Sequence, residues 1–408
     1  MEYSQAIDWL YGRQAAGIKL GLANIERLLN ELSLPAKGTK IVHVAGTNGK
    51  GSVCAFAESI LRAAGEKTGL YTSPHLVSFC ERIRIEGNPA AKSDVASGIS
   101  SLQELTADWR PQPTFFEIAT ALALQIFDHH DISTAVMEVG LGGRLDSTNV
   151  LTPTVCAITP IGLDHRHILG ETCAQIAHEK AGILKPGVAA VCAPQPDEAR
   201  KVLEQRALEV GTSLTFINRP WTASRVSLPG EHQNWNAALA VAALQAGGFK
   251  IPGDAIQKGL AETAWRARFE RIETPGQADI IVDGAHNAGG ARALVQTWRD
   301  IYGDTKPVII CAVAANKDIA AIIAPLAEIA GHFIFPGLLT LRNTTTPEDL
   351  NQLVPSGIAS RCTLTVREAL EKARLAGKPI LVAGSLFLAG EILSLLDKTP
   401  DQYEPSEQ

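Results

Sequence analysis

The sequence predicts an α/β protein with two domains: a P-loop-type domain around a mostly parallel sheet, then a smaller α/β domain. Three observations support this prediction. Residues 41–52 have the pattern of a strand, a glycine-rich turn and a helix. Residues 277–398 alternate short apolar runs with helical patterns, which is typical of a parallel sheet. A chain of 408 residues, 46% of them apolar, is long enough for about two domains with full cores.

The glycine-rich turn carries the strongest chemical signal. Residues 41–52 read IVHVAGTNGKGS, so Lys50 and Ser52 follow the turn at the start of a helix. Backbone N–H groups at such a helix start can bind a phosphate, and the lysine adds a positive charge. The pattern departs from the common motif, because Val44 replaces its first glycine and Gly51 separates Lys50 from Ser52. A tight turn without a ligand is the alternative, but the lysine and hydroxyl favour phosphate binding.

Composition and charge exclude several classes of protein. A net charge of −6 gives no support to nucleic-acid binding. The sequence has no run of about 18 apolar residues for a membrane span, and its first residues lack the layout of a signal peptide. The seven cysteines are scattered without a C-x-x-C pair, which fits reduced thiols. We therefore expect a cytoplasmic protein without nucleic-acid or membrane partners.

Helical patterns flank the phosphate loop. Residues 5–34 carry apolar positions at helical spacing, interrupted by a predicted loop at 17–22. Beyond the loop, an apolar helix is expected from Val53, and residues 68–76 predict a short strand that leaves through Ser73 and Pro74. Ser73 could serve a site or belong to an ordinary polar loop.

A capped helix and a buried strand follow. Thr114 and Glu117 form a capping box for a helix through Phe127, and that structural role is sufficient by itself. Residues 134–140 predict a buried strand that carries Glu138 near its end. Such a carboxylate needs a partner, and ligands of parallel sheets collect at the carboxyl ends of strands. Metal or nucleotide contact is therefore favoured over a structural ion pair.

Two further basic residues follow the next predicted strand, residues 155–159. His165 lies past the end of that strand and could reach the same edge as Glu138, although a lone histidine is usually structural. Lys180 lies near a predicted helix end, where a lysine is ordinarily a solvated cation.

The second half of the chain predicts the second domain. A helix is expected over 237–246, and residues 274–276 read Thr-Pro-Gly, a linker between domains 1–272 and 277–398. Strands are predicted at 280–282, 308–311, 332–335, 364–366 and 380–383, each followed by a helix. The first of these strands ends before Asp283 and His286. Residues 399–408 are polar and expected to be frayed.

Taken together, the motifs resemble those of one enzyme family. They are residues 46–52, 71–75, 138–146, 163–165, 179–182 and 283–287. In this order, over nearly the whole chain, they resemble the bifunctional dihydrofolate synthase/folylpolyglutamate synthases of the Mur ligase superfamily. The resemblance implies a Mur-ligase central-type domain followed by a Rossmann-like one. It also implies an ATP-dependent ligase that activates a carboxylate as an acyl phosphate and joins it to L-glutamate.

The resemblance further implies a role for individual residues. ATP would contact Thr47, Asn48, Gly49, Lys50, Gly51, Ser52, Asn236, Arg268 and Asp283. One Mg²⁺ would be held by Ser52, Ser73 and Glu138, and a second by His165 and Lys180, whose amine is carbamoylated in the family. His286 would lie near the glutamate. The dihydropteroate or folate pocket would involve Leu20, Gly21, Thr114, Phe116, Glu117, Leu145, Asp146 and Ser147. The chain would act as a monomer, and domain closure would complete the site.

Three positions depart from the family pattern. Ala288 stands where proline usually follows Asn287, Ala267 replaces the glycine before Arg268, and residues 314–318 are less acidic. None of these changes removes a predicted ligand, so they bear on rate and substrate preference.

Three rival functions remain to be weighed. A monofunctional folylpolyglutamate synthase would not use dihydropteroate, whereas residues 144–149 are close to the bifunctional form. A ligase for nucleotide-linked peptidoglycan precursors is expected to carry about 100 residues of another domain before the phosphate loop. A nucleotide-binding module without ligase activity would lack His165, Lys180 or the second domain.

Overall fold

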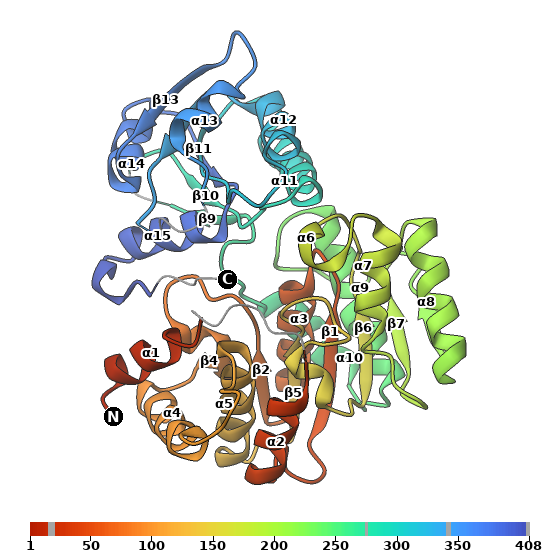
Figure 1. Ribbon diagram of the computed structural model, residues 1–408. Helices are drawn as coiled ribbons and strands as arrows, with labels where there is room; N and C mark the ends of the chain where they lie inside the picture. The colour runs from red at the N-terminus through yellow and green to blue at the C-terminus, as the bar shows by residue number, and fades with distance from the viewer. Residues whose placement is uncertain (15–20, 274–275, 340–343, 405–408) are drawn as a thin grey trace. The chain divides into compact units, whose positions relative to one another are not determined.

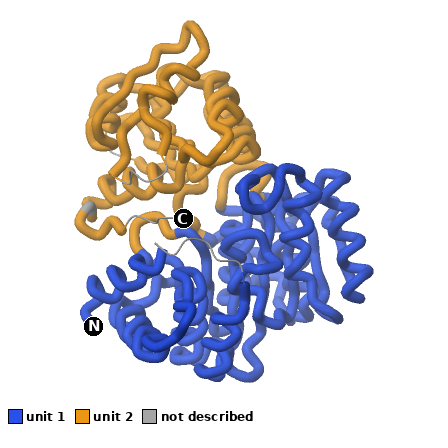
Figure 2. The backbone as a smooth tube through the Cα atoms, in the orientation of Figure 1, with its two compact units in different colours: residues 1–74, 79–227, 234–263 blue, residues 75–78, 228–233, 264–408 orange. Residues whose placement is uncertain are grey.

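The computed structural model describes residues 1–14, 21–273, 276–339 and 344–404. The chain forms two compact units. Unit 1 comprises residues 1–74, 79–227 and 234–263, and unit 2 comprises residues 75–78, 228–233 and 264–408 (Figure 2). Thr274 and Pro275 of the predicted linker lie outside the described residues. The predicted domain bounds, 1–272 and 277–398, stay a prediction.

Unit 1 is built on an eight-stranded sheet in the order β4-β3-β2-β5-β1-β6-β7-β8 (Figure 1). Its strands are β1 (Lys40–Ala45), β2 (Thr68–Tyr71), β3 (Ile83–Ile85), β4 (Asn88–Pro89), β5 (Thr134–Glu138), β6 (Val155–Ile158), β7 (Ala190–Cys192) and β8 (Leu214–Phe216). The antiparallel pairs of this sheet are β2–β3 and β3–β4, and its other described pairs are parallel. In the parallel register Val44 pairs with Glu138, so the strand before the phosphate loop and the strand carrying Glu138 end side by side.

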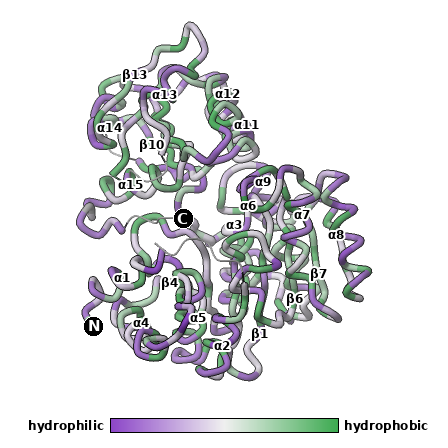
Figure 3. The backbone as a smooth tube through the Cα atoms, viewed as in Figure 1, coloured by the Kyte–Doolittle hydropathy of each residue, from purple (hydrophilic) through white to green (hydrophobic). Residues whose placement is uncertain are grey.

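Helices cover both faces of this sheet. They are α1 (Tyr3–Tyr11), α2 (Ala23–Leu32), α3 (Lys50–Ala63), α4 (Lys92–Thr106), α5 (Phe115–His129), α6 (Arg166–Leu169), α7 (Cys173–Ala181), α8 (Asp197–Val210), α9 (Glu231–Ala246) and α10 (Gly253–Glu262), with 3-10 turns at Phe79–Arg82 and Ser147–Val150. On the face of β1 that carries Ile41 and Ala45, one hydrophobic cluster joins the sheet to α1, α2, α4 and α5, and a second joins it to α7 and α8. The exposed side of α8 is largely hydrophilic (Figure 3).

Unit 2 is a smaller α/β unit with a sheet in the order β13-β12-β11-β14-β10-β9. Its elements are β9 (Glu270–Ile272), β10 (Ile280–Val282), α11 (Ala288–Tyr302), β11 (Val308–Cys311), α12 (Ile319–Ile329), β12 (His332–Pro336), α13 (Pro347–Gln352), β13 (Ala359–Thr363), α14 (Val366–Arg374), β14 (Ile380–Ala383), α15 (Leu386–Leu396) and a 3-10 turn at Pro400–Gln402. Only β9 is antiparallel. One cluster packs α11 and α12 on the sheet, and another packs α14 and α15.

A short segment from early in the chain, residues 75–78, belongs to unit 2. Val77 is buried in the cluster with α14 and α15. The Val77 carbonyl accepts from the Glu404 N–H at 2.8 Å, and His75 Nε2 lies 2.7 Å from the Glu404 carbonyl. We expected the residues after Lys398 to be frayed, but Tyr403 and Glu404 are held by these contacts and by a bond from Tyr403 Oη to Phe387 O.

The predicted two-unit α/β architecture is confirmed, with corrections at element boundaries. The predicted strand at 364–366 is wrong, because β13 precedes it and Thr365 instead caps α14. The polar edge strand β13 offered no apolar run to identify it. Helix α9 begins at Glu231 rather than at residue 237, and α3 begins at Lys50 itself. Among the described helices, none has the length and apolar character needed to cross a membrane.

Candidate active site

The phosphate loop connects β1 to α3 through two glycines with positive φ. Gly46 has φ 143° and Gly49 has φ 90°. A Cβ at Gly46 would lie 1.8 Å from Thr159 Oγ1, and a Cβ at Gly49 would lie 2.5 Å from Asn236 Oδ1. Both positions therefore require glycine on conformational and steric grounds. The second contact also places Asn236, a predicted nucleotide residue, against the loop.

The available N–H groups of this loop lie at its helical end. The Thr47 and Asn48 N–H groups both donate to the Pro160 carbonyl, at 3.0 and 3.3 Å. No side chain caps α3, whose first residue is Lys50. The first N–H groups of a helix have no partner within the helix, and the helix dipole favours an anion there. Lys50 Nζ folds back to 3.4 Å from the Thr47 carbonyl, so its charge lies over the loop.

The side chains around this helix start fit a cation. Ser52 Oγ is buried and has no hydrogen-bond partner among the described residues. On the neighbouring strand, Glu138 is buried and its Oε2 accepts from the Ser73 N–H at 3.1 Å. A hydroxyl and a carboxylate are the oxygen ligands that Mg²⁺ accepts, together with water and phosphate. Within the described ranges, no group of three or more His, Cys, Asp or Glu side chains forms a protein-only metal site.

Lys180 is a buried base rather than a solvated cation. It lies near the end of α7 with only 5% of its surface exposed, and Nζ donates to the Gly46 carbonyl at 2.8 Å. Burial, and then the charge of Lys50, lowers the pKa of Lys180 to about 7, against the opposing effect of Asp164 and Asp146. A large part of this amine is therefore neutral near pH 7. The structure thus brings Lys180 to the phosphate loop.

The loop that follows β5, residues 141–149 (called the 141–149 loop below), holds the end of α7 in place. Its Arg144 N–H donates to Glu179 O at 2.7 Å, and Asn149 Nδ2 donates to Gly182 O at 3.1 Å. A Cβ at Gly143 would lie 2.7 Å from Glu179 O and 3.0 Å from Lys180 Cα. The glycine therefore allows the loop to touch the backbone that carries Lys180.

The predicted acceptor-pocket carboxylates are occupied by internal hydrogen bonds. Glu117 Oε2 accepts from Thr114 N and Oγ1 at 2.7 and 2.8 Å, which confirms the capping box. Asp146 likewise accepts from Leu141 N and from Thr148 N and Oγ1. Of the other predicted pocket residues, Phe116 lies on α5, and Leu145 and Ser147 lie on the 141–149 loop. Leu20 lies outside the described residues, and Gly21 precedes α2.

His165 lies at the start of α6 and is more exposed than Lys180. Its backbone is left-handed, with φ 50°, and its side chain is 37% exposed. The preceding Asp164 is buried, accepts from the His165 N–H at 2.8 Å and acts electrostatically on Lys180. Sequence reasoning gave Asp164 no role, although it stands in the same motif. Its position between the end of a predicted strand and His165 could have identified Asp164 as a candidate site residue.

Unit 2 gathers three predicted residues around the turn after β10. Asp283 accepts from Phe269 N and Ala285 N, both at 2.8 Å, and Arg268 Nη1 donates to the Ala267 carbonyl at 2.9 Å. His286 Nδ1 lies 2.8 Å from Gly284 O. Ala267 has φ 53°, a left-handed conformation, which explains in physical terms why glycine suits this position.

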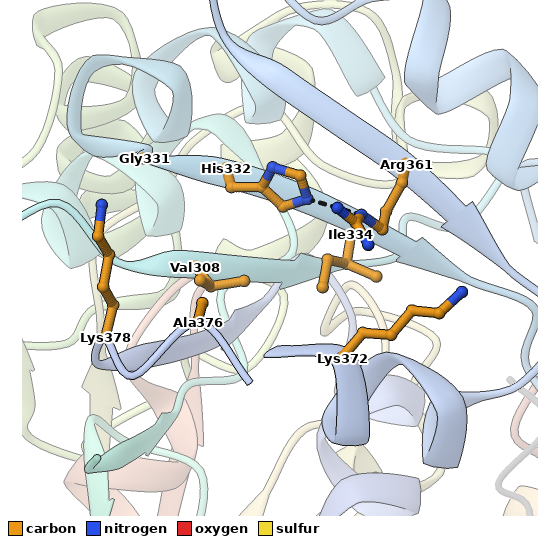
Figure 4. Close-up of a pocket in the computed structure, with 8 residues that line it drawn as sticks. All are labelled: Val308, Gly331, His332, Ile334, Arg361, Lys372, Ala376 and Lys378. Carbon is orange, nitrogen blue, oxygen red and sulfur yellow. Dashed lines mark hydrogen bonds between the residues drawn. The ribbon is translucent and has the colours of Figure 1, made fainter. Parts of the chain in front are cut away.

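One cavity elsewhere in unit 2 contains none of the predicted site residues. It has a volume of about 260 Å³ and is lined by Val308, Gly331, His332, Ile334, Arg361, Lys372, Ala376 and Lys378. Arg361 donates to His332, while the amines of Lys372 and Lys378 extend to opposite sides (Figure 4). Val308 and His332 begin their strands, so the cavity adjoins the edge opposite Asp283 and His286.

Comparison with known proteins agrees with the motifs and the fold. The Mur ligase middle domain matches residues 44–210, and the Mur ligase glutamate ligase domain matches residues 267–386. The dihydrofolate synthase/folylpolyglutamate synthase of Bacillus subtilis is 32% identical over 96% of this chain and 98% of its own length. Among solved structures, E. coli FolC in complex with DHPP and ADP has a TM-score of 0.86 at 29% identity, covering 96% of this chain and 98% of the other. The Yersinia pestis bifunctional enzyme with AMPPNP and Mn has a TM-score of 0.87 at 29% identity, covering 97% and 98%.

Proposed function

Because this chain belongs to the dihydrofolate synthase/folylpolyglutamate synthase family of ATP-dependent ligases, we propose that it joins L-glutamate both to dihydropteroate and to folates. The γ-phosphoryl group of ATP passes to the acceptor carboxylate and ADP leaves. The amine of glutamate then attacks the acyl phosphate, an amide bond forms, and phosphate leaves. The observation that carries the proposal is the phosphate loop with its uncapped helix, the Ser52 hydroxyl that has no partner in the described ranges, and the buried Lys180 beside it.

In this proposal the residues of unit 1 stabilise charge on the phosphates and hold the nucleotide and a cation. The N–H groups at the start of α3 and the Lys50 ammonium would stabilise the transferring phosphoryl group, which needs positive charge and alignment rather than a protein nucleophile. Ser52, Ser73 and Glu138 would hold a divalent cation, which supplies charge neutralisation between the phosphates. Asn236 would contact the nucleotide from α9. From unit 2, Arg268 and Asp283 would serve the nucleotide and His286 the glutamate.

Lys180 would act as a carbamate. A neutral amine is the form that reacts with CO₂, and burial keeps the pKa of Lys180 at about 7. The neutral amine adds to CO₂, a new N–C bond forms and one N–H proton is released, so the product is an anionic oxygen ligand. With His165 it would then hold a second cation, as the family resemblance implies. The buried carboxylates of Asp146 and Asp164 lie near enough to influence the lysine and would disfavour an added negative charge unless a cation neutralised it.

Finer properties of the enzyme belong to the same proposal. We infer a cytoplasmic monomer, with dihydropteroate or folate, L-glutamate and ATP as its small-molecule partners. Size-exclusion chromatography with light scattering tests the monomer directly, since a dimer would elute at twice the 43.4 kDa chain mass.

Release of ADP by the purified protein tests the function. The assay contains ATP, Mg²⁺ and glutamate, with either dihydropteroate or tetrahydrofolate as the acceptor. Turnover with both acceptors is the expected result. Turnover with tetrahydrofolate alone would make the chain a dedicated folylpolyglutamate synthase. A folded protein that binds ATP and turns over neither acceptor would overturn the ligase proposal.

A further inference from the structure

His43 is a polar side chain on an otherwise apolar face of the central strand. Alternate residues of β1 face the same side, and Ile41 and Ala45, on either side of His43, each belong to a hydrophobic cluster. The His43 side chain is completely buried, with 0% exposure. Burying a polar group costs free energy unless hydrogen bonds compensate for the lost water. An apolar residue would satisfy the packing alone, so the imidazole needs another explanation.

The imidazole begins a chain of buried hydrogen bonds. His43 Nε2 lies 2.8 Å from Thr148 Oγ1, and that hydroxyl donates to Asp146 Oδ1. Because the hydroxyl has one proton and gives it to the carboxylate, Nε2 must carry a proton and donate to the threonine oxygen. His43 Nδ1 then carries no proton, and it has no hydrogen-bond partner in the described part of the chain.

The donor role of His43 does not change with pH in the working range. Burial, and then the charge of Lys185, lowers the pKa of His43 to about 3. The ring therefore stays neutral, and the tautomer is fixed by the threonine. His43 is a constant donor rather than a switch.

At the other end, Asp146 uses its carboxylate to shape the 141–149 loop. Oδ2 accepts from Leu141 N at 2.9 Å, and Oδ1 accepts from Thr148 N at 3.0 Å as well as from the Thr148 hydroxyl. Burial raises the pKa of Asp146, and these bonds, with one from Gly140, oppose that effect. Three donors, Leu141 N, Thr148 N and Thr148 Oγ1, therefore bind one carboxylate. The side chain therefore organises the loop that also carries Leu145 and Ser147.

We propose that His43 is a positioning residue for the acceptor pocket and acts through Thr148 and Asp146. The relay ties the 141–149 loop to β1, the strand that leads into the phosphate loop. The inference rests on the proposed function, since it assigns this loop to the dihydropteroate or folate pocket. Loss of the relay should weaken acceptor binding more than ATP binding, because β1 is also held by β5 and β6 on its two sides.

Two substitutions of Thr148 isolate the relay. Thr148→Val removes the hydroxyl and keeps the shape, whereas Thr148→Ser keeps the hydroxyl. We expect Thr148→Val, which removes the hydroxyl that accepts from His43 and donates to Asp146, to raise the KM for dihydropteroate roughly tenfold, with the KM for ATP within about twofold. Thr148→Ser should stay near wild type. The matched control is Thr106→Val, since Thr106 is equally buried but its hydroxyl donates to the Leu102 carbonyl of its own helix.

A double variant distinguishes the relay from a general packing role. If His43 acts through Thr148, His43→Leu combined with Thr148→Val should cost no more than Thr148→Val alone. Additive losses, or equal rises in both KM values, would overturn the inference.

A second measurement separates this inference from the proposed function. Amide hydrogen exchange in the 141–149 loop should speed up roughly tenfold in Thr148→Val and stay unchanged in Thr106→Val. This readout needs no turnover, so it applies even if the wild-type protein acts on neither acceptor. Unchanged exchange in Thr148→Val would reject the relay whatever the activity.

Discussion

Gly143→Ala should move Lys180 without changing any polar group. The new Cβ would lie 2.7 Å from the Glu179 carbonyl oxygen, whereas ordinary contacts begin at 3.4 Å. Relief of this contact needs a shift of roughly 0.7 Å between the 141–149 loop and the end of α7. If α7 takes up the whole shift, the bond from Lys180 Nζ to Gly46 O lengthens from 2.8 Å to about 3.5 Å, beyond the usual range.

The expected losses follow from this displacement. Overpacking of this kind costs about 1–3 kcal/mol of stability. A misplacement approaching 1 Å costs on the order of 100-fold in rate when the displaced group is part of the site. Steady-state ADP release gives kcat/KM, and urea unfolding gives the stability.

A matched glycine variant controls for the substitution itself. A Cβ at Gly253, at the start of α10, would meet nothing within 4 Å. Gly253→Ala should therefore keep wild-type kcat/KM. Wild-type activity in Gly143→Ala, or an equal loss in both variants, would refute the argument that the loop positions Lys180.

Three further predictions concern charge. Lys50→Ala should lower kcat at least about 1,000-fold, because the transferring phosphoryl group loses the positive charge that stabilises it. The midpoint of urea unfolding should not change. Substantial turnover would reject the phosphate role of Lys50. Lys180→Ala should lose activity and recover part of it with added formate or acetate, whereas full activity without either acid would exclude a carbamate. Burial raises the pKa of Glu391 to about 7 from 4.5, so the native state holds the proton more tightly and wild-type stability falls as the pH rises through that window. Glutamine does not titrate, so the free energy of unfolding of Glu391→Gln should not fall in this way. It should equal that of wild type near pH 4.5 and exceed it at pH 8 by about 2 kcal/mol, after allowance for partial solvation. Urea unfolding of both proteins, beside the exposed Glu371→Gln as control, checks this; parallel pH profiles would contradict it.

Buried strands were the most predictable part of the fold. β1 and β5 are apolar because both faces of a parallel sheet are covered, and such runs stand out in a sequence. β13 was placed wrongly because it is a half-exposed edge strand whose residues Ala359–Thr363 are mostly polar. Periodicity also missed that α3 starts at Lys50, since a glycine-rich segment carries no helical pattern.

The candidate site was predictable in its residue types but not in its contacts. Lys180 resembled an ordinary surface cation, and only the fold shows that it is buried against Gly46. Spacing predicted the capping box of Thr114 and Glu117. It did not predict that the Asp146 carboxylate accepts from nearby N–H and hydroxyl donors. Such pairings depend on side chains meeting in three dimensions, which spacing along the chain does not specify.

The place of residues 75–78 in unit 2 has a consequence for anyone who cuts or recombines this chain. A fragment that starts at residue 264 would lack Val77, which is part of its hydrophobic interior, and the Leu76 carbonyl that lies close against Gly390. Its last turns would lose the strand-like bond between Glu404 and Val77. The remaining fragment, residues 1–263, would keep residues 75–78 without the rest of unit 2. Transplanting unit 2 between relatives therefore requires exchanging this short N-terminal stretch with it.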